Sequence, residues 1–330
     1  MLKIGVLGTG HLGKIHLKCI GLANESYELA GFFDPNPEVA KTVAETYNTT
    51  AFPSAAALIE AVDVVDIVTP TTTHFALAKE VIEAGKHLFI EKPITHTLEE
   101  AKELVDLAKE KGVKVQVGHV ERFNPALLAL GNTPVNPMFI EAHRLAVFNP
   151  RGTDVSVILD LMIHDLDIIL SLVKSEVKEV HASGVAVVSD TVDIANARIA
   201  FENGCIANLT TSRISLKQMR KVRFFQPDAY ISLDFLDKQA QLIRLYDQDE
   251  TPPTGGQNFE LETNKGKKTI HMAMPEIEPV NAIKLELETF AQSIQNDLRP
   301  KVNAEDGYRA LALAYQITEA IEESLSASRS

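Results

Sequence analysis

The chain has 330 residues and a formal net charge of −13, from 45 acidic and 32 basic side chains, which argues against a general nucleic-acid binder. No stretch approaches the roughly twenty apolar residues of a membrane-spanning helix, and no signal-peptide pattern opens the chain. Cys19 and Cys205 lie far apart on apolar segments, which indicates buried thiols and a cytoplasmic location. The length suits two domains.

Strand and helix patterns alternate over the first 118 residues. Val64 to Val68 is a continuous apolar run, which is typical of a parallel strand covered on both faces. The alternation predicts a doubly wound parallel sheet, with a first domain over residues 1–122. Strands are predicted at Leu2–Leu7, Tyr27–Phe33, Val64–Val68, His87–Ile90 and Lys114–Val117, and helices at 11–22, Pro35–Tyr47, Thr73–Ala84 and from Thr97 to Gly112.

After Arg122 the pattern changes to strands with little helix between them. This predicts a second, α+β domain over residues 123–299 with a large, mostly antiparallel open sheet. Such a sheet needs covering, so we expect a homodimer or homotetramer. Strands are predicted at 138–147, Lys178–Val188, Asp193–Phe201, Cys205–Ser212, Val222–Gln226, Ala229–Leu233 and Ala240–Tyr246, a loop at Asp247–Asn258, and helices at 155–173, Val280–Asn296 and Ala304–Leu325.

A glycine-rich turn follows the first predicted strand. Gly8 allows the tight turn, Gly10 lets the backbone approach a pyrophosphate, and Gly13 permits close packing of helix on sheet. The helix that begins at His11 and Leu12 offers free N–H groups and a partial positive charge to a diphosphate. The alternative is a tight turn with packing glycines and no ligand, but the flanking strand and helix favour a dinucleotide site.

Asp34 ends the second predicted strand, where a carboxylate accepts hydrogen bonds from the adenosine ribose hydroxyls. A carboxylate there repels a 2′-phosphate, and no Arg follows it, so NAD is favoured over NADP. Pro35 also suits the first position of a helix capped by Asp34, an interpretation compatible with the same role.

Thr69, Pro70 and His74 follow the strand at Val64–Val68 and stand at the carboxyl edge of the predicted sheet. Ligands bind at this edge in open α/β folds, so the three residues are candidates for the nicotinamide side of the groove. In the alternative interpretation, which is equally compatible with the sequence, Pro70 only ends the strand and Thr72 only caps the next helix.

Lys92 follows a strand at the same edge, and Pro93 restricts its backbone to extended dihedrals and is itself a candidate for a cis bond. Oxidation of an alcohol requires the hydroxyl proton to leave, and a positioned ammonium stabilises the developing alkoxide charge. An isolated Lys-Pro pair is usually a surface feature, but its position here favours a catalytic lysine.

Asp160 and His164 are four apart on a helical pattern and are therefore predicted on one helix face. Histidine suits general base chemistry near neutral pH, and a carboxylate one turn away orients the ring or contacts a second hydroxyl. On this segment alone, a buried structural histidine is the simpler interpretation. No group of His, Cys and acidic residues has zinc-ligand spacing, so we expect no catalytic metal.

The chain resembles the glucose-fructose oxidoreductase / inositol dehydrogenase / MocA family over nearly its whole length. The resemblance implies a Rossmann domain, a second domain whose open sheet forms a subunit interface, and C-terminal helices, at about 300–330, that pack back on the first domain. It also implies catalytic Lys92 and His164, an assisting Asp160, and Glu91 near the nicotinamide ribose. The resemblance rests on Gly8-x-Gly10-x-x-Gly13, Thr69-Pro70 with His74, Glu91-Lys92-Pro93, Asp160-x-x-x-His164 and Asn303-Ala-Glu-Asp306-Gly307.

The segment 118–126, Gly-His-Val-Glu-Arg-Phe-Asn-Pro-Ala, is similar to family members that oxidise the sugar 3-hydroxyl of UDP-N-acetylglucosamine. Arg122 is therefore a candidate to hold an anionic group, with Arg144 and Arg213 as further candidates for a diphosphate. In the alternative interpretation Asn124 caps a helix, with Pro125 at its first position, and Arg122 makes an internal salt bridge.

The prediction is an NAD-dependent dehydrogenase acting on a sugar hydroxyl, with UDP-N-acetylglucosamine as the expected substrate. One group of rivals shares the chemistry: an inositol or free-sugar dehydrogenase, or an imine reductase. Two others differ in class, namely a glycosidase that uses NAD without net redox change and an NAD-binding sensor. The set Lys92, Asp160 and His164 argues against the sensor, because a sensor has no need of an acid–base pair.

Overall fold

The computed structural model describes residues 1–149, 155–263 and 266–329. The chain divides into unit 1, Met1–Phe123 with Asn281–Ala312, and unit 2, Asn124–Val280 with Leu313–Ser330. Among the residues so described, no helix is long and apolar enough to cross a membrane.

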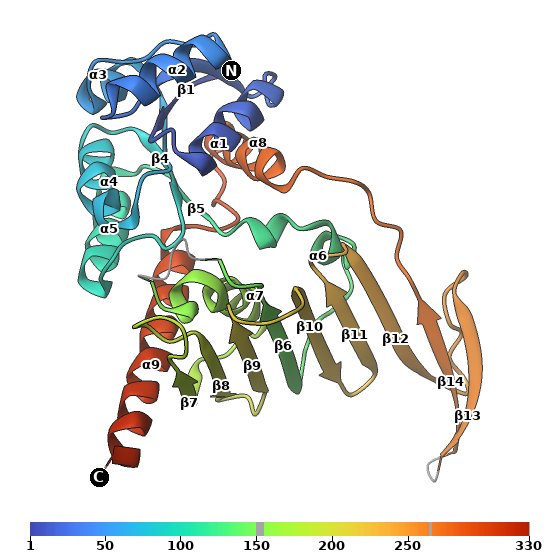
Figure 1. Cartoon of the computed structure of the whole chain (residues 1–330). Coiled ribbons are helices and arrows are strands. Elements are labelled where there is room, and N and C mark those ends of the chain that lie inside the picture. The colour runs from blue at the N-terminus through green and yellow to red at the C-terminus, as the bar shows by residue number, and fades with distance from the viewer. Residues whose placement is uncertain (150–154, 264–265, 330) are drawn as a thin grey trace. The chain divides into compact units, whose positions relative to one another are not determined.

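Unit 1 is built on a five-stranded parallel sheet in the order β2-β1-β3-β4-β5, as Figure 1 shows in blue to green. All four residues of β3 are buried, which explains their uninterrupted apolar character apart from Asp66. The predicted doubly wound sheet is confirmed. The strands are β1 (Leu2–Leu7), β2 (Tyr27–Phe33), β3 (Val64–Ile67), β4 (His87–Glu91) and β5 (Val115–Gly118); the helices are α1 (His11–Leu22), α2 (Pro37–Tyr47), α3 (Ala55–Ala61), α4 (His74–Glu83), α5 (Leu98–Lys111) and α8 (Ala282–Gln295).

Two helices of unit 1 differ from the prediction. Helix α2 begins at Pro37 rather than Pro35, because the Asn36 side chain caps it by accepting hydrogen bonds from the N–H groups of the first turn. Helix α3 was not predicted; it is only seven residues long and is capped by the Ser54 hydroxyl. The predicted capping box of Thr97 and Glu100 is present at the start of α5.

Helix α8 belongs to unit 1, which differs from the predicted domain boundary at residue 299. Its side chains Leu287 and Phe290 are fully buried in one hydrophobic cluster with residues of α1, β1 and β2. The Tyr27 hydroxyl of β2 also donates a hydrogen bond to the Leu287 carbonyl at 2.9 Å. An apolar helix face has to be buried somewhere, and the sequence alone did not indicate which domain would bury it.

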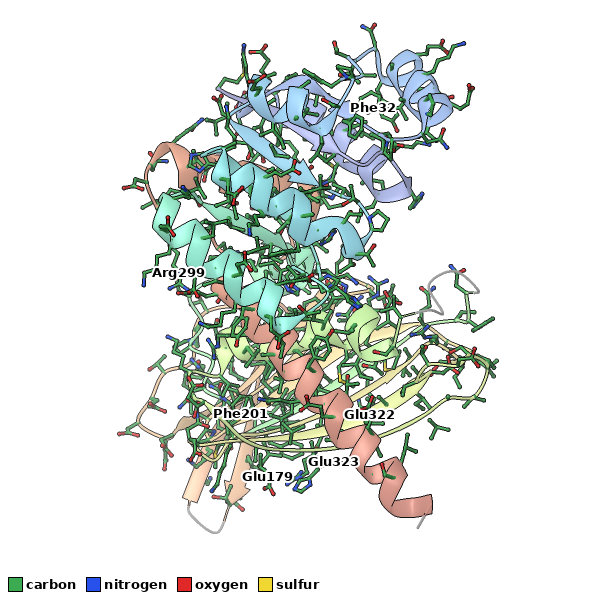
Figure 2. All side chains as sticks on the ribbon, turned by 90° about the vertical axis from the view of Figure 1, so that its left-hand side faces the viewer. Phe32, Glu179, Phe201, Arg299, Glu322 and Glu323 are labelled. Atoms are coloured by element: carbon green, nitrogen blue, oxygen red, sulfur yellow. The ribbon has the colours of Figure 1, made fainter. Side chains whose placement is uncertain are left out.

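The motif at residues 303–307 starts α9 (Ala304–Arg329), which contributes its first residues to unit 1 and the others to unit 2. Asn303 and Asp306 bond reciprocally, side chain to backbone, so the motif closes the helix N-terminus. Just before the helix, Arg299 pairs with Glu305 at 3.0 Å, and Figure 2 labels this arginine. Gly307 packs on β5, where an added Cβ would lie 2.8 Å from Val117.

Unit 2 is built on a nine-stranded sheet in the order β13-β14-β12-β11-β10-β6-β9-β8-β7, antiparallel except for the parallel pair β6–β9 (Figure 1). This confirms the predicted sheet. The strands are β6 (Phe139–Leu145), β7 (Val177–Val185), β8 (Ile194–Phe201), β9 (Ile206–Ser212), β10 (Met219–Gln226), β11 (Ala229–Asp234), β12 (Gln239–Asp247), β13 (Gln257–Thr263) and β14 (Gly266–Ala273); the helices are the short α6 (Pro125–Leu128) and α7 (Ile163–Leu172).

The last two strands were not predicted, and β13 begins inside the end of the predicted loop at Asp247–Asn258. The segment Asn258–Glu262 alternates polar and apolar residues, but it is short and follows directly on a glycine- and proline-rich stretch that was predicted as a loop. Nearly every residue of β13 is exposed, including Phe259 and Leu261, so the strand buries no side of its own.

One face of the unit 2 sheet carries the core. Along β6 the residues Ile140 and Ala142 are buried while their neighbours are half-buried, as the two-residue period of a strand requires. Helices α7 and α9 add apolar side chains to the same cluster. In Figure 2, the labelled Phe201 lies within this unit and Phe32 within unit 1; each is almost fully buried in its own unit.

Candidate active site

A glycine turn at the carboxyl end of β1 forms the centre of a cavity in unit 1. Gly8 adopts a φ of +90°, and a Cβ on it would lie 2.9 Å from the Val68 carbonyl oxygen. A Cβ on Gly13 would lie 2.0 Å from the Gly8 carbonyl oxygen, so only glycine lets α1 pack this closely on the turn. Around Gly10 there is no atom within 4 Å of the Cβ position, which leaves space for a ligand to approach the backbone.

The cavity has a volume of about 810 Å³ and runs along the carboxyl ends of β2, β1, β3 and β4. Most of the predicted cofactor-binding residues line it, and Gly13 and His74 lie behind the lining instead. The lining includes the predicted residues Gly8, Gly10, His11, Leu12, Asp34, Thr69, Pro70, Glu91 and Lys92, and the unpredicted residues Leu7, Phe33, Pro35, Val68, Thr72, Thr73, Ala76 and Leu77. A groove that crosses four strand ends at the start of a helix fits a dinucleotide.

Asp34 is held in place at the β2 end of this cavity. Its Oδ2 accepts hydrogen bonds from the backbone N–H and the hydroxyl of Thr9, both at 2.9 Å, and its Oδ1 accepts from the Asn36 N–H at 3.0 Å. The carboxylate is therefore fixed by the backbone and still lines the cavity.

His74 is buried behind the cavity and bridges the segments that follow β3 and β4. Its Nδ1 lies 3.0 Å from the Pro93 carbonyl oxygen and its Nε2 lies 3.0 Å from the Thr69 carbonyl oxygen. Burial lowers the pKa of His74, although the two carbonyls oppose this shift. His74 thus supports the Thr69 and Lys92 segments without reaching the cavity.

Glu91 and Lys92 stand at the β4 end of the cavity. The Lys92 N–H donates to the Glu91 Oε2 at 3.1 Å, and the Lys92–Pro93 peptide is cis, in line with the expectation for this proline. Glu91 also lies 3.2 Å from the ring of His16, a residue of α1 that the sequence interpretation missed. A histidine among the buried positions of an otherwise apolar helix face was the available signal.

Asp160 and His164 lie in unit 2, where a π-helical turn over Ile158–Met162 precedes α7. Asp160 belongs to the π turn and His164 to the α-helix, and both side chains are half-buried. The prediction placed both residues on one face of a regular α-helix. The π turn changes that geometry, because it is wound with i→i+5 hydrogen bonds. Such turns occur frequently at functional sites.

Arg144 and Arg213 are buried inside unit 2. Arg144 makes a bidentate ion pair with Asp165, at 3.0 Å from Nε and 2.8 Å from Nη2, and its side chain is only 3% exposed. Arg213 donates to the Val155 carbonyl and lies 3.8 Å from Asp193. This geometry gives no support to the predicted diphosphate contacts, because a guanidinium withdrawn toward a ligand would leave a buried carboxylate unpaired.

Arg122 lies just after β5, in a short turn over Val120–Phe123, and is half-buried. The neighbouring cation is Lys301, whose ammonium lies 4.7 Å from the centre of the Phe123 ring. Burial and then Arg122 lower the pKa of Lys301, which places two positive charges close together. Asn124 caps α6 with Pro125 at the first position, as the alternative interpretation of this segment predicted.

Comparisons with known proteins agree with this geometry. Residues 2–119 match the family model described as an oxidoreductase family with an NAD-binding Rossmann fold, and residues 141–226 match the GFO/IDH/MocA C-terminal domain. The chain is 38% identical to the UDP-N-acetylglucosamine 3-dehydrogenase of Acidithiobacillus ferrooxidans over 322 residues, which is 97% of each chain.

Solved structures extend the comparison. A structure of UDP-N-acetylglucosamine 3-dehydrogenase from Acidithiobacillus ferrooxidans has a TM-score of 0.86 at 37% identity and covers 98% of both chains. Levoglucosan dehydrogenase in complex with NADH has a TM-score of 0.82 at 19% identity and covers 98% of this chain and 97% of that one. At 19% identity, the likeness to levoglucosan dehydrogenase shows the fold alone.

Proposed function

The chain belongs to the GFO/IDH/MocA oxidoreductase family and is a dehydrogenase with an NAD-binding Rossmann domain, and from that premise we propose that it oxidises the 3-hydroxyl of UDP-N-acetylglucosamine. The observation that carries the substrate assignment is the identity of 38% over 97% of both chains with a relative of that name. The segment 118–126 agrees with it, since it resembles family members with this substrate.

NAD is the proposed cofactor, in preference to NADP. The support is Asp34, whose carboxylate is fixed by Thr9 and Asn36 at the cavity end where an adenosine ribose is expected. A carboxylate in that position accepts hydrogen bonds from ribose hydroxyls and repels a 2′-phosphate. When bound, NAD supplies the acceptor for the hydride that leaves the substrate carbon.

Lys92 and His164 are the proposed catalytic residues. His164 accepts the proton of the substrate hydroxyl, because a neutral imidazole is a suitable base near pH 7. Asp160 assists by stabilising the imidazolium that this step creates. Lys92 donates a hydrogen bond from its ammonium to the substrate oxygen and so stabilises the developing alkoxide.

Arg122 is the arginine that we retain for the diphosphate of the substrate. It is half-buried, whereas Arg144 and Arg213 are buried with protein partners. A guanidinium binds phosphate oxygens in a planar, two-pronged geometry, which suits this role.

We also infer a homodimer or homotetramer in the cytoplasm. The outer face of the unit 2 sheet carries half-buried aromatic side chains, with the Phe139 and Phe225 rings 6.0 Å apart and the Phe225 and Tyr230 rings 5.1 Å apart. A second copy would cover such a face. Cys19 and Cys205 are buried free thiols, which suits a reducing compartment.

A substrate panel tests the proposed function. Initial rates of NADH formation are compared for UDP-N-acetylglucosamine, free N-acetylglucosamine and myo-inositol at equal concentrations. The proposal predicts turnover with the nucleotide sugar and little with the other two. Turnover with inositol or the free sugar alone would move the substrate to those classes.

A further inference from the structure

Three ionisable side chains form a buried row in unit 1 that the proposed chemistry leaves unused. His16 on α1 lies between Asp66 on β3 and Glu91 on β4. The His16 Nδ1 is 2.8 Å from the Asp66 Oδ2, and the His16 Nε2 is 3.2 Å from the Glu91 Oε1. The exposed fractions of the three side chains are 0, 0 and 12% in the order His16, Asp66 and Glu91.

Two carboxylates that face the two ring nitrogens favour a proton on each nitrogen of His16. A neutral imidazole has one N–H and one lone pair, so it would turn a lone pair toward one of the two carboxylates. Burial alone would lower the pKa of His16, but Asp66 and then Glu91 raise it well above the usual value. For Asp66, burial raises the pKa of the carboxyl group, and His16 opposes that shift. His16 has two carboxylate neighbours, whereas each carboxylate has one histidine neighbour within the row. We therefore assign the additional proton of the row to the His16 ring.

Glu91 is the member of the row that reaches the cavity. Two contacts hold its carboxylate, His16 at Oε1 and the Lys92 N–H at Oε2, and the carboxylate occupies the space where a side chain on Gly118 of the neighbouring strand would lie. The contact with His16 is close but poorly aligned as a hydrogen bond, so its main contribution is electrostatic attraction. Asp66 does not line the cavity and can influence it through His16.

We propose that His16 is a positioning residue: bridging Asp66 and Glu91, it holds the Glu91 carboxylate, and with it the Lys92 backbone, in one orientation at the nicotinamide end of the cavity. The nicotinamide end is assigned because Asp34 occupies the opposite, adenosine end. The reaction itself rests on the proposed function, but the contacts do not.

A purely structural role explains the row less well. A buried ion pair often stabilises a fold no more than well-packed apolar side chains of the same size, and the surroundings here are apolar. The Phe89 ring meets the His16 ring edge-on at 5.6 Å between centres, and Ile4, Val64 and Leu17 are fully or almost fully buried in the same core. The charged row lies under the β4 end of the cavity, where it orients a side chain of the cavity wall.

The first experiment measures the protonation of His16 without any ligand. Nitrogen NMR of the cofactor-free protein with ¹⁵N-labelled histidine, at pH 7.5, assigns the His16 signals by their loss in His16→Gln. We expect both ring nitrogens of His16 in the protonated range. A neutral ring would overturn the proposal, and this result does not depend on the identity of the substrate.

The second experiment compares Asp66→Asn, Glu91→Gln and the double variant by kcat, KM and the Kd values for NAD and NADH. Displacement of Glu91 should lower kcat in each single variant by on the order of 100-fold. The double variant should lose no more than the worse single variant, because both changes act through one carboxylate. The proposal would be overturned if the kcat loss of the double variant equalled the product of the two single losses, or if kcat were unchanged in Asp66→Asn.

The matched control is Tyr27→Phe, which removes one buried hydrogen bond from the same core without touching Glu91. It should lower Tm without the loss of kcat. If Asp66→Asn fails to fold, His16→Gln takes its place in the same comparison. If the wild-type protein makes no NADH from UDP-N-acetylglucosamine, the proposed function fails, while the nitrogen signals and the cofactor Kd values still decide the role of His16.

Discussion

Gly118 and Glu91 lie opposite each other in register at the ends of β5 and β4, and a Cβ on Gly118 would lie 2.6 Å from the Glu91 Oε1. The missing side chain of Gly118 is therefore the space that the Glu91 carboxylate occupies. A side-chain-free position on one strand thus sets the direction of an acidic side chain on the next.

Gly118→Ala should displace Glu91 while leaving the fold intact, because the atom that has to move is the free end of a flexible side chain. We expect a loss of kcat/KM of about tenfold or more. The free energy of unfolding should change by no more than about 1–3 kcal/mol, the usual cost of overpacking. Steady-state kinetics and urea unfolding measure the two effects separately. A variant with wild-type kinetics would show that the position of Glu91 is unimportant.

Gly10 and Gly13 offer a contrast between ligand space and packing. The free energy of unfolding of Gly10→Ala should stay within about 1 kcal/mol of the wild-type value, since Gly10 has an ordinary φ of −61° and open space around it. It should weaken NAD binding by roughly 10- to 100-fold, because the new methyl group occupies the space of the pyrophosphate. Titration with NAD and denaturant unfolding check both values.

Gly13→Ala serves as the counterpart, because its Cβ would meet the Gly8 carbonyl oxygen at 2.0 Å. This variant should be destabilised by about 1–3 kcal/mol or more even without NAD. Equal stability of the two variants would contradict the assignment of Gly10 to ligand space and Gly13 to packing.

Asp34→Ala should bind NAD more weakly and should discriminate less between NAD and NADP. The carboxylate contributes charge-assisted hydrogen bonds to the ribose, so its loss should raise the Kd for NAD by roughly 10- to 100-fold, or about 1.5–3 kcal/mol. The Kd for NADP should fall relative to that for NAD, because the repulsion of the 2′-phosphate is removed. Binding titrations with both cofactors measure the ratio, and an unchanged ratio would remove Asp34 from the selectivity argument.

Arg144→Met tests whether this arginine is structural. Breaking its buried pair leaves Asp165 without its bidentate partner, and we expect a loss of about 3–5 kcal/mol in the free energy of unfolding. The double variant Arg144→Met with Asp165→Leu should recover most of that stability, because the carboxylate that lost its bidentate partner is removed as well. Denaturant unfolding measures both variants. A stable Arg144→Met protein with a raised KM for the nucleotide sugar would restore the predicted diphosphate contact.

Much of unit 1 could be predicted from the sequence because its signals are local. A glycine turn between a strand and a helix, an acid at the end of the next strand, and Glu91-Lys92-Pro93 each depend on a few adjacent residues. The structure places Gly8, Gly10, Asp34 and Lys92 around one cavity in agreement with those signals.

The missed features depend on neighbours that are distant in the chain. His16 meets Asp66 and Glu91 only after three elements have packed together, and nothing near His16 in sequence indicates them. Arg144 was a candidate for diphosphate contacts because a sequence does not show whether an arginine will be buried. The π turn at Ile158–Met162 has no distinguishing pattern and replaces the regular helix that the spacing of its residues suggested.

The central claim is tested most directly by the absorbance of NADH after cofactor-stripped protein is mixed with NAD and UDP-N-acetylglucosamine. The account predicts NADH formation by the wild-type protein and none by Lys92→Ala, whose Kd for NAD stays close to that of the wild type. Absence of NADH at stoichiometric wild-type enzyme, or full activity of Lys92→Ala, would contradict it.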